Sequence, residues 1–344
     1  MSAKSFGLDI GVTSIKAVEL QKKGDGYLLS AAITLDGPSK GILSEAILDQ
    51  EEEAMSIRRL VTEGKISSKE VHLALPENQV YTRVIEMPVL SDKELSTAIY
   101  WEAEQYIPVP LETLQLAWEI LRKPDHPHED AKMQVLLVGA PLSLINRYEK
   151  IFSMTGITIV SIETEILSTV RALVTGDKFP NTLIVSLGAM STSLAIIKDG
   201  IIVFTYSIPT GGTAINRAIA TDFGFSVDQA EEYKKVYGMS DDALGGKIGQ
   251  ATTPILMSII DEVKKALAFY SEKYKNEAPI GQIVLSGGSA KLPGIQSFFA
   301  EHCGVEIAMA NPWKILTSQQ VPKEILDNAP HYTIAVGLAM KDYE

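Results

Sequence analysis

An acidic residue, a glycine, two hydroxyl residues and a lysine follow one another closely near the start of the chain. They are Asp9, Gly11, Thr13, Ser14 and Lys16, within the apolar sequence FGLDIGVTSIKAVEL. Backbone N–H groups at a glycine turn and a lysine ammonium bind phosphate oxygens, and a carboxylate holds Mg²⁺, usually through the ion's waters. The set suits a metal-bound polyphosphate, with Asp9 as the metal residue. An ordinary β-hairpin with a polar turn fits the same residues equally well.

A similar pattern returns later in the chain as LIVSLGAMSTSLAII, residues 183–197. Aligned on its glycine, Gly188, this second copy has a hydroxyl residue, Ser186, where the first copy has Asp9. Self-similarity over a long period indicates a duplicated unit, and chance similarity between two hairpins is the alternative. If two related domains carry these hairpins face to face, the turns clamp the phosphates of one nucleotide in a cleft between the domains.

Strands and helices alternate around both hairpins. Apolar alternation predicts strands within 6–20, 27–35, 71–76, 79–88, 114–121, 133–141, 157–163 and 182–209 and at the start of 282–294. Helices are predicted at 44–63, 91–106, 142–154, 166–174, 211–224, 228–237, 252–275, 295–303 and 333–342. Ser91 and Glu94 form a capping box before the second of these, and Pro254 is expected in the first turn of the helix 252–275. Residues 71–154 therefore form a small α/β unit inserted into a larger domain.

Length and charge limit the classes of function. The chain has 344 residues, which predicts two domains, and its net charge of −12 without a Lys/Arg cluster argues against nucleic-acid binding. The single cysteine, Cys303, excludes an internal disulfide and fits a reducing compartment. The N-terminus lacks the apolar core of a secretory signal, and no apolar run is long enough to span a bilayer. We therefore expect a soluble cytoplasmic protein.

Three motifs resemble those of the actin, Hsp70 and sugar-kinase superfamily. FGLDIGVTSIK is similar to its phosphate-1 motif, SLGAMST to its phosphate-2 motif and IVLSGGSAKLPG to its adenosine motif. IPTGG and AEEYK also match, and VIEMP…LSTAIYWEAEQYIPVPLE resembles the PilM family of type IV pilus assembly, in the FtsA and PilM branch. The resemblance covers essentially the whole chain. It implies an actin-like α/β fold of duplicated RNase-H-like domains, with ATP and Mg²⁺ between them and an inserted FtsA/PilM-type subdomain.

The resemblance also implies domain limits. Domain 1A would comprise residues 1–70, completed by 155–180 and 331–344, the inserted subdomain 1C residues 71–154, and domain 2 residues 181–330 with a 2B insertion at about 215–280.

It further implies which residues contact the nucleotide, ATP or ADP. Asp9 would hold Mg²⁺ through water, the two hairpin turns would hold the phosphates, and further glycine turns and one helix would contact ribose and adenine. These residues are Asp9, Gly11, Val12, Thr13, Ser14, Lys16, Gly188, Ala189, Ser191, Gly211, Gly212, Glu231, Lys234, Gly287, Gly288 and Ser289. A solvent-facing strand lysine is the alternative for Lys16, and an exposed helix face for Glu231 and Lys234.

Ser186 departs from the pattern of the superfamily. Relatives that hydrolyse ATP carry aspartate at this position, whereas serine has no charge for the metal and is a poor base. Glu163 or Glu165, in the segment between the domains, is placed to compensate, although acidic residues are common in the first turn of a helix without any catalytic role. We therefore expect nucleotide binding with slow or absent hydrolysis.

The predicted helix 91–106 carries more aromatic surface than a small core needs. Tryptophan and tyrosine are common interface anchors, and packing within the subdomain is the alternative. The resemblance implies a partner, the N-terminal cytoplasmic peptide of a PilN-like inner-membrane protein, and we expect it near Met87, Trp101 and Tyr106. Pilus motor ATPases would be further partners.

Membrane association would come through that partner, because the C-terminus shows no amphipathic anchor of the FtsA kind. The protein would then be cytoplasmic and peripheral at the inner membrane, in a pilus or in a competence pseudopilus. Two other functions stay open: an FtsA-like division protein that polymerises, and a small-molecule kinase of the same superfamily, which Ser186 disfavours.

Overall fold

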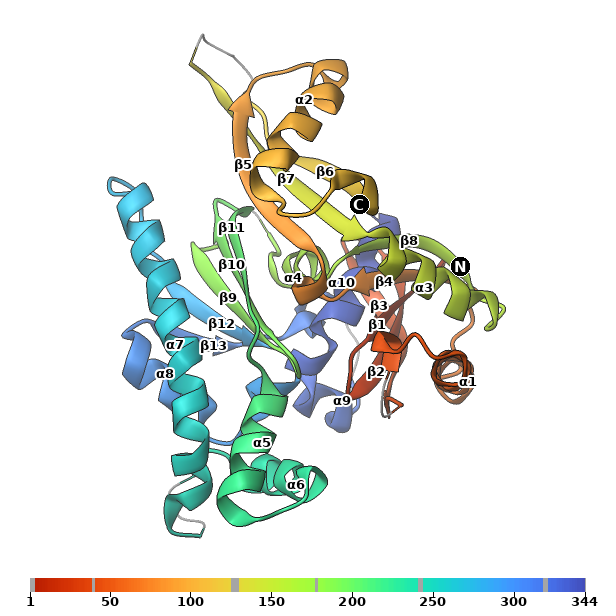
Figure 1. Ribbon diagram of the computed structural model, residues 1–344, viewed down its shortest axis with the longest axis vertical. Helices are drawn as coiled ribbons and strands as arrows, with labels where there is room; N and C mark the ends of the chain where they lie inside the picture. The colour runs from red at the N-terminus through yellow and green to blue at the C-terminus, as the bar shows by residue number, and fades with distance from the viewer. Residues whose placement is uncertain are drawn as a thin grey trace.

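The computed structural model describes residues 4–38, 41–124, 130–176, 179–240, 244–317 and 321–343. Two five-stranded sheets and one three-stranded sheet form its framework (Figure 1). The first sheet contains, in spatial order, β3 (Gly26–Asp36), β2 (Ser14–Lys23), β1 (Phe6–Ile10), β4 (Glu70–Leu75) and β8 (Thr158–Thr164). The second contains β11 (Ile201–Ile208), β10 (Thr192–Lys198), β9 (Thr182–Leu187), β12 (Gln282–Ser286) and β13 (Glu306–Met309).

The two large sheets repeat one another in strand order and direction. In each, three successive antiparallel strands are joined by two strands that run parallel to the first. Each hairpin turn is also closed by an equivalent hydrogen bond. The Gly11 N–H donates to the Ser14 carbonyl at 3.0 Å, and the Gly188 N–H donates to the Ser191 carbonyl at 2.9 Å. The duplication predicted from the sequence is therefore confirmed.

Two helices lie between the sheets, α4 (Glu165–Leu173) and α10 (Thr333–Met340). Ala335 of α10 packs on the first sheet, and Ile166 of α4 packs on the second. The helices cross so closely that a side-chain carbon on Gly337 would lie 1.8 Å from the Ser168 carbonyl oxygen. Only glycine fits at this crossing, which sets how closely the two halves of the molecule approach each other.

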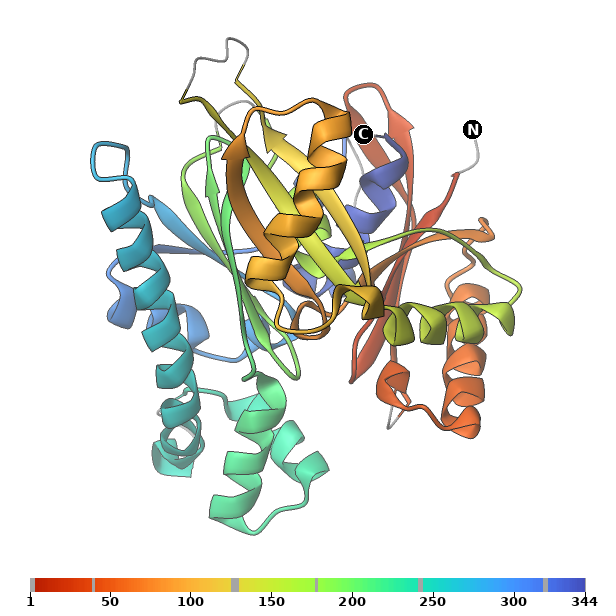
Figure 2. The ribbon, with the colours of Figure 1, turned by 45° about the horizontal axis from the view of Figure 1, so that its top comes forward.

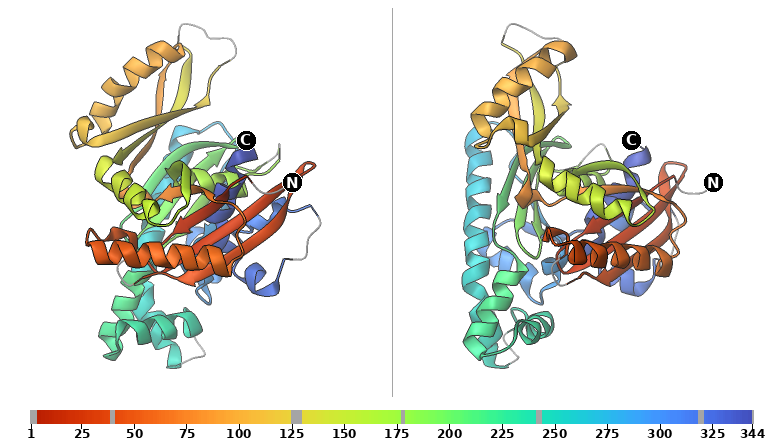
Figure 3. Two further views of the ribbon diagram at one scale, coloured as in Figure 1. Left: turned by 90° about the vertical axis from the view of Figure 1, so that its right-hand side faces the viewer. Right: turned by 45° about the vertical axis from the view of Figure 1, so that its right-hand side comes forward.

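Helices also cover the outer faces of both sheets (Figure 3). α1 (Ile47–Glu63) and α3 (Leu142–Ser153) pack on the first sheet, while α7 (Lys247–Lys273) and α8 (Ile295–Cys303) pack on the second. α5 (Gly212–Phe223) and α6 (Val227–Tyr237) lie beyond the end of the second sheet, beside α7, and extend its core cluster (Figure 1). The short helix α9 (Lys323–Asp327) packs beside α10 through Ile325. Within the described ranges, no helix combines the length and apolar character needed to cross a membrane.

α7 is longer than the sequence predicts. It begins at Lys247 instead of residue 252, so Pro254 lies inside the helix and not in its first turn. A proline inside a helix removes one backbone N–H donor. The additional residues bury Ile248 and Ala251 in the core of the second sheet, and this burial offsets the lost hydrogen bond.

The predicted bounds of the inserted unit, 71–154, are too wide, because β4 pairs within the first sheet and α3 packs on that sheet. The three-stranded sheet belongs to the smaller unit that lies between them in the chain. Its antiparallel strands are, in spatial order, β5 (Tyr81–Pro88), β7 (Lys132–Pro141) and β6 (Leu114–Arg122), and α2 (Asp92–Tyr106) covers one face of them (Figure 2). α2 buries Leu95, Ile99 and Ala103 against this face. The predicted capping box is confirmed, because Ser91 and Glu94 each accept a hydrogen bond from the backbone N–H of the other.

The opposite face of the inserted unit rests against the second sheet. Val84 of β5 packs in the cluster that α4 forms with β9 and β10. The Thr205 hydroxyl of β11 donates to the Thr82 carbonyl of β5 at 3.1 Å, and the Lys273 ammonium of α7 lies 2.8 Å from the Glu86 carboxylate. The inserted unit is therefore covalently continuous with the first sheet and contacts the second sheet and α7 non-covalently.

Candidate functional site

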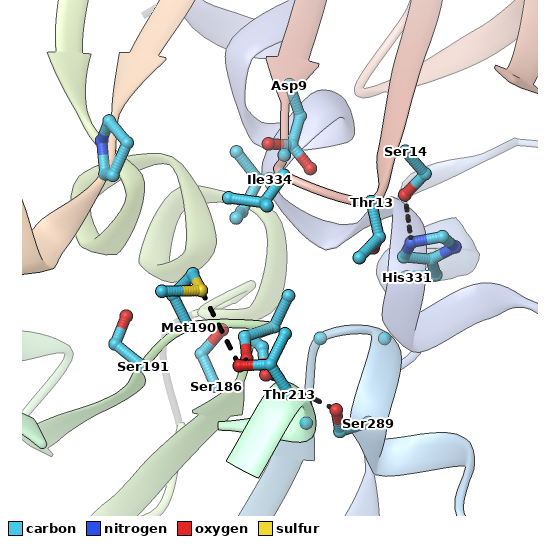
Figure 4. Close-up of a pocket in the computed structure, with 18 of the residues that line it drawn as sticks. Asp9, Thr13, Ser14, Ser186, Met190, Ser191, Thr213, Ser289, His331 and Ile334 are labelled. Atoms are coloured by element: carbon cyan, nitrogen blue, oxygen red, sulfur yellow. Dashed lines mark hydrogen bonds between the residues drawn. The ribbon is translucent and has the colours of Figure 1, made fainter. Parts of the chain in front are cut away.

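A cavity of about 490 Å³ lies where the two repeated turns face each other. The β1–β2 turn forms one side and the β9–β10 turn the other, with Asp9 and Thr13 across the cavity from Ser186 in Figure 4. The N-terminus of α5, one face of α6, the residues after β12 and the 3-10 helix η7 (Ala329–Tyr332) complete the wall. Both halves of the chain therefore build the cavity.

Nearly all residues expected to contact a nucleotide line this cavity. They are Asp9, Gly11, Val12, Thr13, Ser14, Lys16, Gly188, Ala189, Ser191, Gly212, Glu231, Lys234, Gly287, Gly288 and Ser289. Gly211 lies directly behind the wall, where a side-chain carbon on it would be 2.6 Å from the Gly188 carbonyl oxygen. The structure thus brings the predicted set together, while the contact of each residue with a nucleotide stays a prediction.

The turn after β12 depends on one glycine. Gly287 has a φ of +84°, and a side-chain carbon on it would lie 2.5 Å from the Leu187 carbonyl oxygen. The positive dihedral angle and the close approach both exclude a larger residue. The turn continues into the 3-10 helix η5 (Gly288–Lys291), where the Ser289 hydroxyl donates to the Gly188 carbonyl at 3.3 Å. The turn after β12 is therefore hydrogen-bonded directly to the β9–β10 turn.

Asp9 and Lys16 form an ion pair at the edge of the cavity. The Lys16 Nζ donates to Asp9 Oδ2 at 2.9 Å, and the two side chains are only 6% and 7% exposed. A buried charge is stable only when it is paired, so each residue supplies the counterion of the other. A solvent-facing lysine at position 16 is thereby excluded, and phosphate oxygens entering the cavity would compete with Asp9 for the Lys16 ammonium.

His331 is a cavity residue that sequence reasoning missed. Its Nε2 lies 3.1 Å from the Ser14 hydroxyl oxygen. Burial, and then three nearby lysines, lower the pKa of His331 to about 2, so its ring is neutral at physiological pH. These lysines are Lys16, Lys291 and Lys235. These lysines line the cavity, where their ammonium groups can bind phosphate oxygens, and the carboxylates of Asp9, Asp36 and Glu231 line it too.

The α6 residues expected near ribose and adenine are half-buried. Lys234 donates from its ammonium to the Gly212 carbonyl at 3.4 Å, and burial lowers the pKa of Lys234. The Asn216 amide donates to the Glu231 carboxylate at 3.2 Å. The alternative of an exposed helix face is therefore wrong, because both side chains are held against the start of α5.

The two candidate catalytic carboxylates lie in different surroundings. Glu163 is outside the cavity wall and is held by ion pairs, at 2.5 Å from the Arg171 guanidinium and 2.7 Å from the Lys341 ammonium. Its carboxylate serves to join β8 to α4 and to the residues after α10, so a catalytic role for Glu163 is excluded by its position. Glu165 does line the cavity. Burial, and then two neighbouring carboxylates, raise the pKa of Glu165 to about 8.

The residues expected to contact a partner peptide do not lie together. The expectation for Met87 is wrong: strand alternation turns its side chain toward α2, where it is 2% exposed within the core of the inserted unit. Trp101 is 69% exposed, on the side of α2 away from that core. Tyr106 lines a second cavity, which lies between the inserted unit and the second sheet.

This second cavity, the β5–β11 groove, has a volume of about 490 Å³. The Arg83 guanidinium lies 4.4 Å from the centre of the Tyr106 ring, and the opposite wall carries Phe204, Tyr206 and Phe269. Aromatic rings beside a guanidinium are typical of the residues that contribute most to protein–protein binding. The groove therefore has the composition of a docking site for a protein segment.

The comparisons with known proteins agree with this architecture. The family described as type IV pilus assembly protein PilM matches residues 7–343. The chain belongs to the PilM family. A solved chain from a PilM–PilN type IV pilus biogenesis complex is 25% identical, with a TM-score of 0.87 over 100% of both chains.

This PilM-family chain is also similar to more distant proteins, one by sequence and one by structure. The cell division protein FtsA of Streptococcus pneumoniae is 24% identical over 345 residues, which cover 89% of this chain and 75% of that protein. MreB5 of Spiroplasma citri, solved with bound AMPPNP, is 14% identical with a TM-score of 0.53, over 100% of this chain and 96% of that one. The predicted actin-like fold is therefore confirmed, and so is the resemblance to the PilM family.

Proposed function

We propose that this chain binds Mg-ATP between its two halves, binds the N-terminal cytoplasmic segment of a PilN-like inner-membrane protein, and thereby serves as a scaffold for a type IV pilus or a competence pseudopilus. The observation that carries the nucleotide half is the pair of facing turns, Gly11–Ser14 and Gly188–Ser191, each closed by the same N–H···O bond. A duplicated phosphate-binding turn on both sides of one cavity suits a polyphosphate that lies between them.

The residues of the cavity fit Mg-ATP in size, shape and charge. Its volume of about 490 Å³ is in the usual range for small-molecule sites. The first turn of α5 lines the cavity at Gly212 and Thr213, and the dipole of this helix favours an anion there. The Gly212 and Thr213 N–H groups donate to the Gly188 and Ala189 carbonyls, which fixes α5 against the second turn. Lys16 would neutralise phosphate, and Asp9 would hold Mg²⁺ through water. When bound, the metal supplies positive charge that the second turn does not have.

The distribution of carboxylates favours binding over turnover. Residues 186–193 of the second turn, SLGAMSTS, contain hydroxyl groups and no acid, whereas Asp9 and Glu165 line the opposite side. Glu165 is protonated near neutral pH because burial raises its pKa to about 8. A protonated carboxyl group cannot accept a proton from water, so hydrolysis is slow.

Phosphate release by the purified full chain with Mg-ATP tests this function. We expect saturable ATP binding by isothermal titration with turnover well below one per minute. Phosphate release at several per minute that the Asp9→Ala substitution abolishes would contradict the proposal for slow hydrolysis. Absence of ATP binding at millimolar concentration would contradict the nucleotide site itself.

The partner half rests on the β5–β11 groove and on the similarity to a chain solved together with PilN. Tyr106 and Arg83 offer an aromatic and a cationic contact at one end of the groove. A PilN-like segment bound there would keep this chain at the cytoplasmic face of the inner membrane through its partner. Fluorescence anisotropy with a labelled synthetic peptide of the PilN-like N-terminus measures the affinity directly.

A further inference from the structure

The short segment that leads from β4 to β5 separates the two cavities. It contains the 3-10 helix η2 (Glu77–Gln79). Pro76, Asn78 and Gln79 line the cavity between the repeated turns, whereas Glu77 lines the β5–β11 groove. Because neighbouring residues of one tight helical turn line different cavities, a shift of η2 changes both cavities at once.

Glu77 joins η2 to the start of α4 by two hydrogen bonds. Its backbone N–H donates to the Glu165 carboxylate at 3.3 Å, and its own carboxylate accepts from the Ile166 N–H at 3.4 Å. Glu77 is 4% exposed, so water does not compete for these bonds. Since Glu165 lines the first cavity, the two hydrogen bonds link a residue of the groove to a carboxyl group of the nucleotide site.

The walls of the groove belong to different halves of the molecule. β5 follows η2 directly in the chain, whereas β11 is the edge strand of the second sheet. The two strands are joined by the bond from the Thr205 hydroxyl to the Thr82 carbonyl. A segment that fills the groove and contacts both walls holds the inserted unit, and with it η2, against the second half of the molecule.

We propose that Glu77 is a positioning residue that couples the groove to the cavity between the repeated turns by holding η2 and Glu165 in place. This inference rests on the proposed function, in which a PilN-like segment fills the groove and Mg-ATP fills the cavity. The nucleotide must contact turns from both halves of the chain. A ligand that holds the halves together therefore tightens ATP binding, and by linkage ATP tightens binding of the segment by the same factor.

Isothermal titration of the full chain with Mg-ATP, alone and with a saturating synthetic PilN-like N-terminal peptide, tests the coupling. In the unmodified protein we expect the peptide to tighten ATP binding by about fivefold or more, the lower end of common allosteric couplings. The Glu77→Ala substitution removes the acceptor for the Ile166 N–H and reduces this factor to less than about twofold. The Glu119→Gln substitution, on the exposed side of β6, serves as the control and leaves the factor unchanged.

The Glu77→Gln substitution separates positioning from simple loss of structure. Its amide oxygen still accepts from the Ile166 N–H, so coupling is retained. The same substitution removes the carboxylate charge. Retained coupling in Glu77→Gln together with lost coupling in Glu77→Ala therefore assigns the effect to the hydrogen bond with the Ile166 N–H.

Three outcomes decide the matter. Retained coupling in Glu77→Ala, or lost coupling in Glu77→Gln, overturns the inference and leaves the proposed function standing. Independent binding of ATP and peptide to the unmodified protein does the same. Failure of the unmodified protein to bind ATP or the peptide overturns the proposed function, and the inference with it.

Discussion

The buried pair of Asp9 and Lys16 gives a sharp test of how the first turn works. The Asp9→Asn substitution removes the counterion of an ammonium that is 6% exposed while keeping the shape of the side chain. Breaking a buried ion pair on one side costs roughly 3–5 kcal/mol, and the asparagine oxygen still accepts from Lys16, which places the loss at about 3 kcal/mol. At roughly 2–4 °C per kcal/mol for a domain of this size, Tm falls by about 6 °C or more.

A matched control comes from an ion pair of similar length on the surface. Arg59 and Glu63 lie 2.7 Å apart on α1, with side chains 67% and 46% exposed. Solvent screens a pair this exposed, so it contributes little to stability, and the Glu63→Gln substitution lowers Tm far less than Asp9→Asn does. Scanning calorimetry without nucleotide compares the two variants. Equal losses would refute the argument that burial, and not the contact itself, makes the first pair important.

Nucleotide should reverse part of that loss. ATP without Mg²⁺, at 100 times its Kd, stabilises the unmodified protein by about 2.7 kcal/mol. In the Asp9→Asn variant the phosphates also return a counterion to Lys16, so the rise in Tm on adding ATP is larger than in the unmodified protein. Addition of Mg²⁺ then strengthens ATP binding in the unmodified protein only, because the variant lacks the carboxylate that would hold the metal. An equal response of both proteins to ATP and Mg²⁺ would exclude the assigned roles.

Three further substitutions give distinct results. Burial raises the pKa of Glu53 to about 7, and neither carboxylate oxygen has a hydrogen-bond partner within the described part of the chain. Because the pKa of Glu53 is higher in the folded than in the unfolded protein, the free energy of unfolding falls as pH rises toward 7. Urea unfolding at pH 8 should therefore show the Glu53→Gln variant to be more stable than the unmodified protein by about 3 kcal/mol, a gain that vanishes near pH 4. Gly287→Ala forces a carbon against the Leu187 carbonyl, so we expect loss of ATP binding by titration in a protein that still folds by circular dichroism. Tyr106→Ala weakens binding of a PilN-like peptide by about tenfold in anisotropy, whereas Trp101→Ala has no effect; the reverse result would move the docking site to the outer face of α2.

Local patterns in the sequence predicted the parts of the site that lie in single turns. The two hairpins are recognisable because each places a glycine between an apolar strand and a pair of hydroxyl residues, and the shared Gly11 and Gly188 bonds confirm the match. The capping box at Ser91 was also predictable, since it depends on spacing within a few residues. The limits of the inserted unit were not, because the pairing of β4 with β1 joins segments about 60 positions apart. Met87 was misplaced although its signal was present, because strand alternation puts it on the same side as Ile85.

Contacts between distant segments were not predictable in the same way. His331 meets Ser14 only because α10 folds back between the sheets, and the two residues are 317 positions apart. Glu163 and Glu165 have the same local setting in the sequence, yet in the folded chain Glu163 pairs with two cations and Glu165 lines the cavity. Their separate roles follow from the position of Lys341, which no local pattern predicts.

The asymmetry between the two repeated turns connects the chemistry of the site to its role in assembly. In the first turn Asp9 neutralises Lys16 when no ligand is bound, so binding of a polyanion rearranges charge on that side. The second turn offers hydroxyl groups and backbone N–H groups without a carboxylate, so under the proposed function it would hold phosphate without positioning an attacking water. Meanwhile the inserted unit contacts the second half of the molecule through Glu86 and Thr82. A nucleotide that is retained and not rapidly hydrolysed would keep both halves, and therefore both walls of the β5–β11 groove, in a fixed relation, which is what a scaffold requires of its ligand.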